Sequence, residues 1–90
     1  MTQPVCVIVG AGPGNGAAFA RRFAGAGHPV ALLARDPSGL ASLAAELPGT
    51  QAFACDATDA AQVEAAFVRI RAELGPVGVL IYNASTRDFA

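Results

Sequence analysis

Four short apolar runs recur along the chain at intervals of about 25 residues, and polar side chains are rare inside them. They cover Val5–Val9, Val30–Ala34, Gln51–Cys55 and Val77–Tyr82, and the third is the weakest. An apolar run without polar alternation is typical of a strand that is covered on both faces, as in a parallel sheet. The pattern therefore predicts four strands, most of them deeply buried.

The three long segments between these runs carry apolar residues at helical spacing. In Ala17–Ala26, Phe19 and Phe23 are four residues apart, and Gly27 follows as a stop signal. The other two stripes consist of Leu40, Leu43, Ala44 and Leu47, and of Val63, Phe67, Ile70 and Leu74. We predict one helix in each segment, packed on the sheet through its stripe.

Capping residues mark where the second and third helices begin. Asp36 is expected to be an N-cap, with Pro37 at the first helical position. Thr58 or Asp59 is expected to cap the third helix, and Gln62 is placed to complete a capping box from Asp59.

Strand and helix alternate, which is the pattern of right-handed crossovers in an α/β, doubly wound parallel sheet. We expect about four strands and three helices, in the strand order 3-2-1-4. Val77–Tyr82 would then lie at an edge although its sequence suits a strand paired on both sides. Because exposed apolar edges pair with other chains, we expect the isolated segment to be weakly stable or to aggregate.

Composition and charge exclude several classes of protein. The 90 residues are 53% hydrophobic and 14% charged, so the chain is globular and holds one domain at most. A net charge of −1 gives no basic surface for nucleic acid, and no apolar segment suits a membrane span. Arg21 and Arg22 are expected on a solvated helix face.

Few residues suggest a redox, acid–base or metal-binding role by their type alone. Cys6 and Cys55 are expected at opposite ends of two strands that are not neighbours, so we predict free thiols and a cytoplasmic protein. His28 precedes a strand, at the end of the sheet where ligands do not bind, and is expected to be a surface loop residue. Two cysteines and one histidine cannot form a closed metal site, so no metal is expected.

Glycines dominate the turn between the first strand and the first helix. Gly10, Gly12, Gly14 and Gly16 follow directly after Val9. Glycine lets a ligand approach the backbone closely, and the N–H groups at a helix N-terminus attract anions. The turn therefore predicts a site for the pyrophosphate of a dinucleotide.

The register of these glycines decides between dinucleotides. A G-x-G-x-x-G motif, as in flavoproteins, would begin at Gly10 but needs a glycine where Asn15 stands. Such a site also needs an acid at the end of the second strand, where the sequence has Ala34. Both mismatches disfavour a flavin.

The spacing Gly10-x-x-x-Gly14-x-Gly16 resembles the T-G-x-x-x-G-x-G motif of the short-chain dehydrogenases/reductases, with Val9 in place of threonine. The extended branch of that family spaces its glycines differently and would need glycine at Pro13. The resemblance implies a Rossmann-type, NAD(P)-binding domain. It implies cofactor contacts from the whole turn, which comprises Gly10, Gly12, Pro13, Gly14, Asn15 and Gly16.

Two later segments carry the same resemblance. Cys55-Asp56-Ala57-Thr58-Asp59 is similar to the family's D-x-T-D segment, which implies that Asp56 and Ala57 lie beside the adenine ring. The alternative to this cofactor contact is that Asp56 caps the N-terminus of the following helix. Tyr82-Asn83-Ala84-Ser85 partly matches the family's N-N-A-G, so Asn83, Ala84 and Ser85 are expected to pass the cofactor.

The end of the second strand bears on the choice between NAD and NADP. Ala34 stands where an acid would select NAD, and Arg35 follows it, where a guanidinium can pair with a 2′-phosphate. We therefore favour NADP as the cofactor. NAD stays possible, because Asp36 could bind the ribose hydroxyls and Arg35 could be a solvated charge.

Catalytic residues are not found in these 90 positions. The resembling family transfers a hydride between nicotinamide and a carbonyl or alcohol, using a serine and a Tyr-x-x-x-Lys pair. The sequence has no lysine, and its one tyrosine, Tyr82, is followed four positions later by Thr86. We expect residues 1–90 to be the N-terminal part of one NAD(P)-binding domain whose remainder supplies catalysis, substrate choice and homo-oligomer contacts. A non-enzymatic nucleotide-binding module is the alternative.

Overall fold

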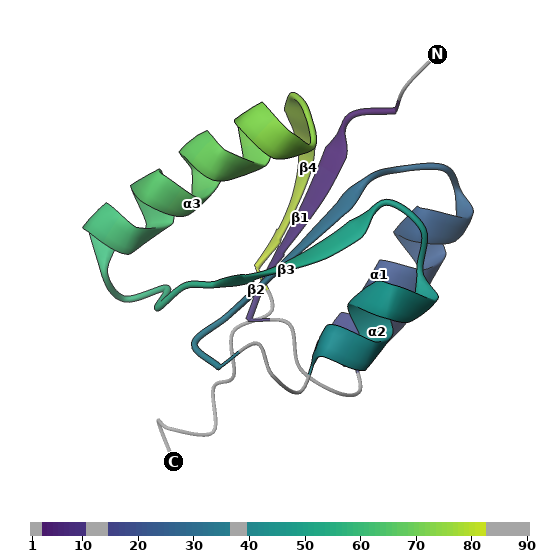
Figure 1. The fold of residues 1–90 in the computed structure, drawn as a ribbon, viewed down its shortest axis with the longest axis horizontal. Helices are drawn as coiled ribbons and strands as arrows, with labels where there is room; N and C mark the ends of the chain where they lie inside the picture. The colour runs from purple at the N-terminus through teal and green to yellow at the C-terminus, as the bar shows by residue number, and fades with distance from the viewer. Residues whose placement is uncertain (1–2, 11–14, 37–39, 83–90) are drawn as a thin grey trace.

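The chain folds around a four-stranded parallel sheet with the strand order β3-β2-β1-β4 (Figure 1). The structure is a computed structural model that describes residues 3–10, 15–36 and 40–82. The strands are β1 (Val5–Val9), β2 (Val30–Ala34), β3 (Thr50–Ala54) and β4 (Val77–Tyr82). This confirms the predicted fold class and strand order.

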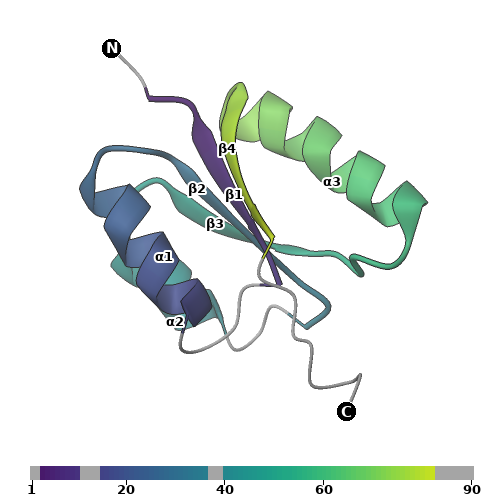
Figure 2. The ribbon, with the colours of Figure 1, turned by 180° about the vertical axis from the view of Figure 1, so that it is seen from behind.

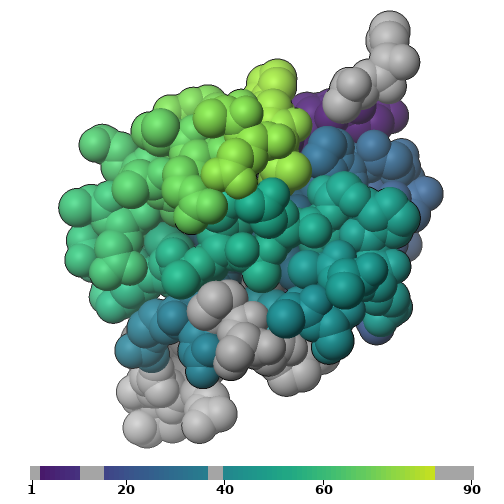
Figure 3. Space-filling model, in the orientation of Figure 1, coloured from purple at the N-terminus to yellow at the C-terminus, as the bar shows by residue number. Residues whose placement is uncertain are grey.

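Helices cover both faces of the sheet. α1 (Asn15–Gly25) and α2 (Ala41–Glu46) lie together on one face, and α3 (Ala60–Glu73) lies on the other (Figures 1 and 2). From the side seen in Figure 3, side chains of α3 lie next to those of the α2–β3 segment. The result is a three-layer α/β arrangement.

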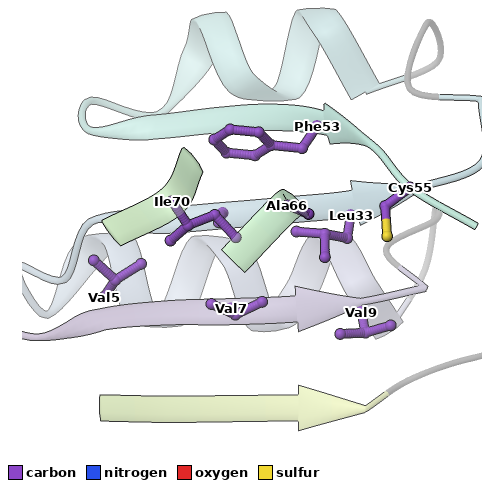
Figure 4. Packing of buried hydrophobic residues seen from close by; sticks show 9 residues of the cluster. Val5, Val7, Val9, Leu33, Phe53, Cys55, Ala66 and Ile70 are labelled. Atoms are coloured by element: carbon purple, nitrogen blue, oxygen red, sulfur yellow. The ribbon is translucent and has the colours of Figure 1, made fainter. Parts of the chain in front are cut away.

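The core has two halves, one on each side of the sheet. Val5, Val7 and Val9 of β1 point toward α3, where Ala66 and Ile70 pack against them (Figure 4). Cys6 and Ile8 belong to the other half, with Ala20 of α1 and Leu43 of α2. All five residues of β1 are buried, which explains why its sequence shows no polar alternation.

β4 is the exception to this burial. It pairs with β1 and alternates between half-buried and exposed residues, and Leu80 and Tyr82 are 59% and 70% exposed. Val7 pairs with Leu80 and Val9 with Tyr82, so these exposed side chains lie on the α3 face of the sheet. An apolar strand therefore lies at an edge of the described sheet, as the sequence predicted.

One predicted helix start is wrong. The N-cap of α2 is Leu40, which makes no side-chain capping hydrogen bond, and the helix begins at Ala41. Asp36 lies four residues before this cap and is therefore not the N-cap of α2. Leu40 and Leu43 are both buried, so the start of α2 packs against the core. Pro37 lies outside the described residues.

Candidate functional site

The carboxyl ends of the parallel strands gather at one edge of the sheet, and the predicted cofactor residues follow them (Figure 1). β1 runs into Gly10, β2 into Arg35, and β3 into Cys55 and Asp56. The register pairs Val9 with Leu33 and Ala34 with Ala54, so these strand ends are aligned. In open α/β sheets this edge is where ligands bind.

Gly10 turns the chain out of the sheet. Its φ of 78° lies in the left-handed region, which a side chain with a Cβ adopts only under strain. Its backbone N–H donates to the Leu33 carbonyl at 2.9 Å and so continues the ladder one residue beyond the strand. The residue is a glycine because the strand must end there in a sharp turn.

α1 begins at Asn15 after this turn, and Gly16 is buried in its first turn. Backbone N–H groups at a helix N-terminus lack intrahelical partners and carry partial positive charge. No acidic residue stands in the first turn of α1 to neutralise that charge. Gly12, Pro13 and Gly14 lie outside the described residues, as does the side chain of Asn15.

Arg35 and Asp36 follow β2 at the same edge, and both are exposed. The charge of Arg35 reaches Asp56, because it helps to hold the pKa of that carboxyl below its usual value after the larger effect of Thr58. The edge therefore presents a cation beyond β2 and a carboxylate beyond β3.

Thr58 holds the side chain of Asp56 in place through two hydrogen bonds. One carboxylate oxygen, Oδ1, accepts a hydrogen bond from the Thr58 hydroxyl at 2.7 Å and another from the Thr58 backbone N–H at 2.9 Å. The two hydrogen bonds lower the pKa of Asp56, the side-chain bond most strongly. Ala57 itself packs against the α3 side of the core.

The cap of α3 adjoins this group. Asp59 is the N-cap, and its Oδ1 accepts from the N–H groups of Ala61 and Gln62, as predicted. The capping box is not completed as expected, because the Asp59 N–H donates to the Asp56 carbonyl at 3.0 Å. Gln62 Oε1 instead accepts from the backbone N–H of Asp56 at 2.9 Å.

Thr58 and Gln62 therefore form hydrogen bonds with Asp56 that were not predicted from the sequence. The D-x-T spacing was the available signal for Thr58, since aspartate commonly accepts from the residue two positions later. Gln62 carried no such signal, because its expected partner was the N–H of Asp59. Asn83, Ala84 and Ser85 follow β4 in the sequence and lie outside the described residues.

The remaining candidates lie elsewhere. His28 Nδ1 is 2.8 Å from the Pro4 carbonyl oxygen, at the opposite edge of the sheet, in agreement with the prediction of a loop residue. Cys6 and Cys55 are buried free thiols that belong to the two different halves of the core. Residues 3–10, 15–36 and 40–82 contain no cluster of three or more groups suited to a metal ion.

A groove of about 170 Å³ lies between β3 and α3, lined by Phe53, Ala54, Gln62, Ala65, Ala66 and Arg69. The Arg69 guanidinium lies over the Phe53 ring, 5.1 Å from its centre. The groove does not include Gly10, Arg35 or Asp56, but Gln62, which accepts from the Asp56 N–H, lines it. No helix in the described part of the chain is long and apolar enough to cross a membrane.

Comparisons with known proteins agree with this geometry. Residues 4–90 match the family model described as short chain dehydrogenase. D-threitol dehydrogenase from Mycolicibacterium smegmatis is 37% identical over 96% of the chain, and galactitol 2-dehydrogenase from Agrobacterium fabrum is 33% identical over 100%. The chain covers 35% and 36% of these two proteins, about a third of each.

Solved structures show the same fold. The crystal structure of a metagenomic short-chain oxidoreductase in complex with NADP superposes with a TM-score of 0.85 at 31% identity. The match covers 96% of this chain and 41% of that one.

Proposed function

The chain belongs to the short-chain dehydrogenase family, and on that premise we propose that it is the NADP(H)-binding part of an oxidoreductase. The enzyme would transfer a hydride between nicotinamide and a small carbonyl or alcohol substrate. The observation that carries this proposal is the alignment of the Gly10 turn, the start of α1 and Arg35 at one edge of the sheet.

Each part of the dinucleotide has a place along this edge. The pyrophosphate would lie against the turn and the N-terminus of α1, where backbone N–H groups can donate to it. The adenine would lie beside Asp56 and Ala57, and the backbone after β4 would pass the nicotinamide side. The proposed contacts are Gly10, Gly12, Pro13, Gly14, Asn15, Gly16, Arg35, Asp36, Asp56, Ala57, Asn83, Ala84 and Ser85.

NADP is the favoured cofactor because of the charges at the end of β2. Arg35 is exposed there and can pair with a 2′-phosphate, whereas Ala34 offers no acceptor for ribose hydroxyls. A related oxidoreductase of known structure binds NADP. Asp36 is the residue through which NAD would be selected instead.

The catalytic groups would come from chain beyond these 90 residues. A tyrosine with a lysine four positions later is absent from the sequence, so hydride transfer would need a longer polypeptide. Two similar proteins are named as dehydrogenases of polyhydric alcohols, which supports a carbonyl or alcohol substrate. Buried free thiols support a reducing, cytoplasmic location, and we further propose that the complete enzyme is a homo-oligomer.

Arg35→Ala in the complete protein tests the cofactor assignment. The affinity for NADPH should fall about tenfold or more, the size of a lost charge-assisted hydrogen bond, while that for NADH changes little. Both affinities can be measured from quenching or enhancement of nicotinamide fluorescence. Arg71→Ala, which removes an exposed arginine from α3, is the matched control. Equal losses for both cofactors would refute the preference for NADP.

A further inference from the structure

β3 is an outermost strand of the described sheet, because it pairs with β2 alone in the order β3-β2-β1-β4 (Figure 1). The Cys55 N–H donates to the Ala34 carbonyl at 2.8 Å, so the backbone groups of Cys55 point toward β2. These groups alternate in direction along a strand, so those of Ala52 and Ala54 point away from β2. No hydrogen bond from residues 3–10, 15–36 or 40–82 reaches these outward groups. β3 therefore has two residues available to bind a further strand.

Nothing within β3 protects this edge from pairing. Natural edge strands commonly carry charged side chains or proline, which prevent another chain from binding. β3 has the sequence TQAFA and contains neither. Its outward residues are alanines, whose small side chains leave the backbone accessible, and Ala54 is exposed. A strand of 5 residues has the usual length, so the edge is long enough to pair with a short partner segment.

The groove of about 170 Å³ between β3 and α3 lies beside this edge. Phe53, Ala65 and Ala66 supply apolar walls, and a cavity of about 150 Å³ holds benzene, so the groove has room for one side chain. In an antiparallel pairing, the partner residue opposite Phe53 stands between the two residues that bond to Ala52 and Ala54. Its side chain points to the α3 face, as that of Phe53 does, and so enters the groove.

Arg69 gives the groove a preference for negative charge. Its Nε donates to Glu73 Oε2 at 3.0 Å, and Glu73 Oε1 accepts from Gln51 Nε2 at 2.6 Å. Glu73 thus orients the guanidinium over Phe53, with both carboxylate oxygens engaged. The two terminal nitrogens of Arg69 make no hydrogen bond with the described part of the chain, and the side chain is 60% exposed. These nitrogens can donate to a carboxylate from a partner.

We propose that the β3 edge binds an extended segment of a partner protein as an added antiparallel strand, with an acidic side chain of that segment in the groove against Arg69. Main-chain hydrogen bonds to Ala52 and Ala54 supply affinity, and the groove supplies specificity. The proposal goes beyond the proposed function and does not depend on it, because the proposed cofactor contacts do not include these three residues.

The test uses three synthetic peptides with acetyl and amide caps. They are Thr-Val-Glu-Val-Thr, Thr-Val-Lys-Val-Thr, and the glutamate peptide with N-methyl groups on both valines. Each is titrated into the isotope-labelled complete protein and followed by amide chemical shifts. The glutamate peptide should shift the amides of Ala52, Phe53 and Ala54 saturably and should bind about fivefold or more tightly than the lysine peptide. The N-methylated peptide should not bind, because it lacks the donors that face β3.

Variants of α3 test the role of charge. Arg69→Gln should bring the affinities of the glutamate and lysine peptides within about twofold of each other, whereas Arg69→Lys keeps the charge and should keep part of the preference. Arg71→Gln is the matched control, because it changes an exposed arginine of α3 that does not line the groove. It should leave the preference unchanged. A thermal melt of each variant verifies that it is folded.

Three results would overturn the proposal. Absence of saturable shifts at about 1 mM glutamate peptide would show that the edge does not accept a strand. Equal binding of the glutamate and lysine peptides would show that Arg69 does not select the partner. If the amides of Ala52 and Ala54 shift on dilution of the protein alone, and light scattering shows a concentration-dependent mass, a second copy already covers the edge. NADPH binding, measured separately, decides the proposed function independently of these results.

Discussion

Backbone conformation at single glycines defines the proposed site at the residue scale. Gly10 has a φ of 78° and directly follows the last residue of β1. Gly25 is the last residue of α1, and a Cβ added there would meet nothing within 4 Å. The two glycines therefore differ in how substitution by alanine would change the free energy of unfolding.

Gly10→Ala should destabilise the protein by roughly 1–2 kcal/mol, because alanine is strained at positive φ. Gly25→Ala should stabilise it by roughly 0.5–1 kcal/mol, because alanine is the better helix former and has space. Urea unfolding of both variants gives the two free energies. The interpretation of Gly10 is wrong if both substitutions stabilise the protein.

Cys6 is a residue whose burial has a consequence for pH. Burial in the core raises the pKa of its thiol from 9.0 to about 11. The folded state thus favours the protonated thiol, and its contribution to stability is complete below pH 9 and is lost as the pH rises toward 11. The free energy of unfolding should fall more steeply over this range in the wild type than in Cys6→Ala. Equal slopes would show that Cys6 does not contribute.

At the scale of elements, strands were the part best predicted from sequence. β1, β2 and β4 begin and end where their apolar runs do. For β1 and β2 the reason is burial on both faces, which requires an unbroken apolar run. β3 is shifted by one residue, to Thr50–Ala54, because the edge strand has a mixed composition that marks its ends poorly. The strand order 3-2-1-4 is the one that belongs to the doubly wound pattern expected from the sequence.

Helix starts and side-chain partners were predicted less well. Asp59 caps α3 as expected, but the N-cap of α2 is Leu40 and not Asp36. For Gln62, the competing bond between the Asp59 N–H and the Asp56 carbonyl redirected the side chain. Such choices depend on tertiary distances that local spacing does not contain. The positions of Gly10, Arg35 and Asp56 at strand ends, by contrast, followed from topology alone.

β4 makes one close contact with the segment that precedes β1. A Cβ at Gly78 would clash with Pro4 Cβ and would lie 2.7 Å from Pro4 Cγ. Pro4 is held in place because His28 Nδ1 lies 2.8 Å from its carbonyl oxygen and the Val5 N–H donates to Pro76. Space at this point is therefore limited.

Gly78→Ala should cost roughly 1–3 kcal/mol of stability, as expected for overpacking. In a Pro4→Gly background, which removes the clashing side chain, the same substitution should cost less than half as much. Chemical denaturation of the four proteins of this double-mutant cycle measures the coupling. An equal penalty in both backgrounds would contradict the contact.

The whole molecule is asymmetric along its strands. The amino edge of the sheet carries His28 and the glycine turns before β2 and β4, and its polar contacts are internal ones such as that between His28 and Pro4. The carboxyl edge carries the Gly10 turn, the start of α1, an exposed arginine and an ionised carboxylate. Helices on both faces leave the strand ends as the place for a polar, anionic ligand.

The central claim is that a nicotinamide dinucleotide binds at this carboxyl edge. Titration of the isotope-labelled complete protein with NADPH, followed by amide chemical shifts, tests it most directly. The amides of Gly10, Gly16, Arg35 and Asp56 should shift with one dissociation constant, while those of His28, Gly49 and Gly75 at the opposite edge stay in place. Shifts confined to the opposite edge, or no saturable shifts at all, would contradict the claim.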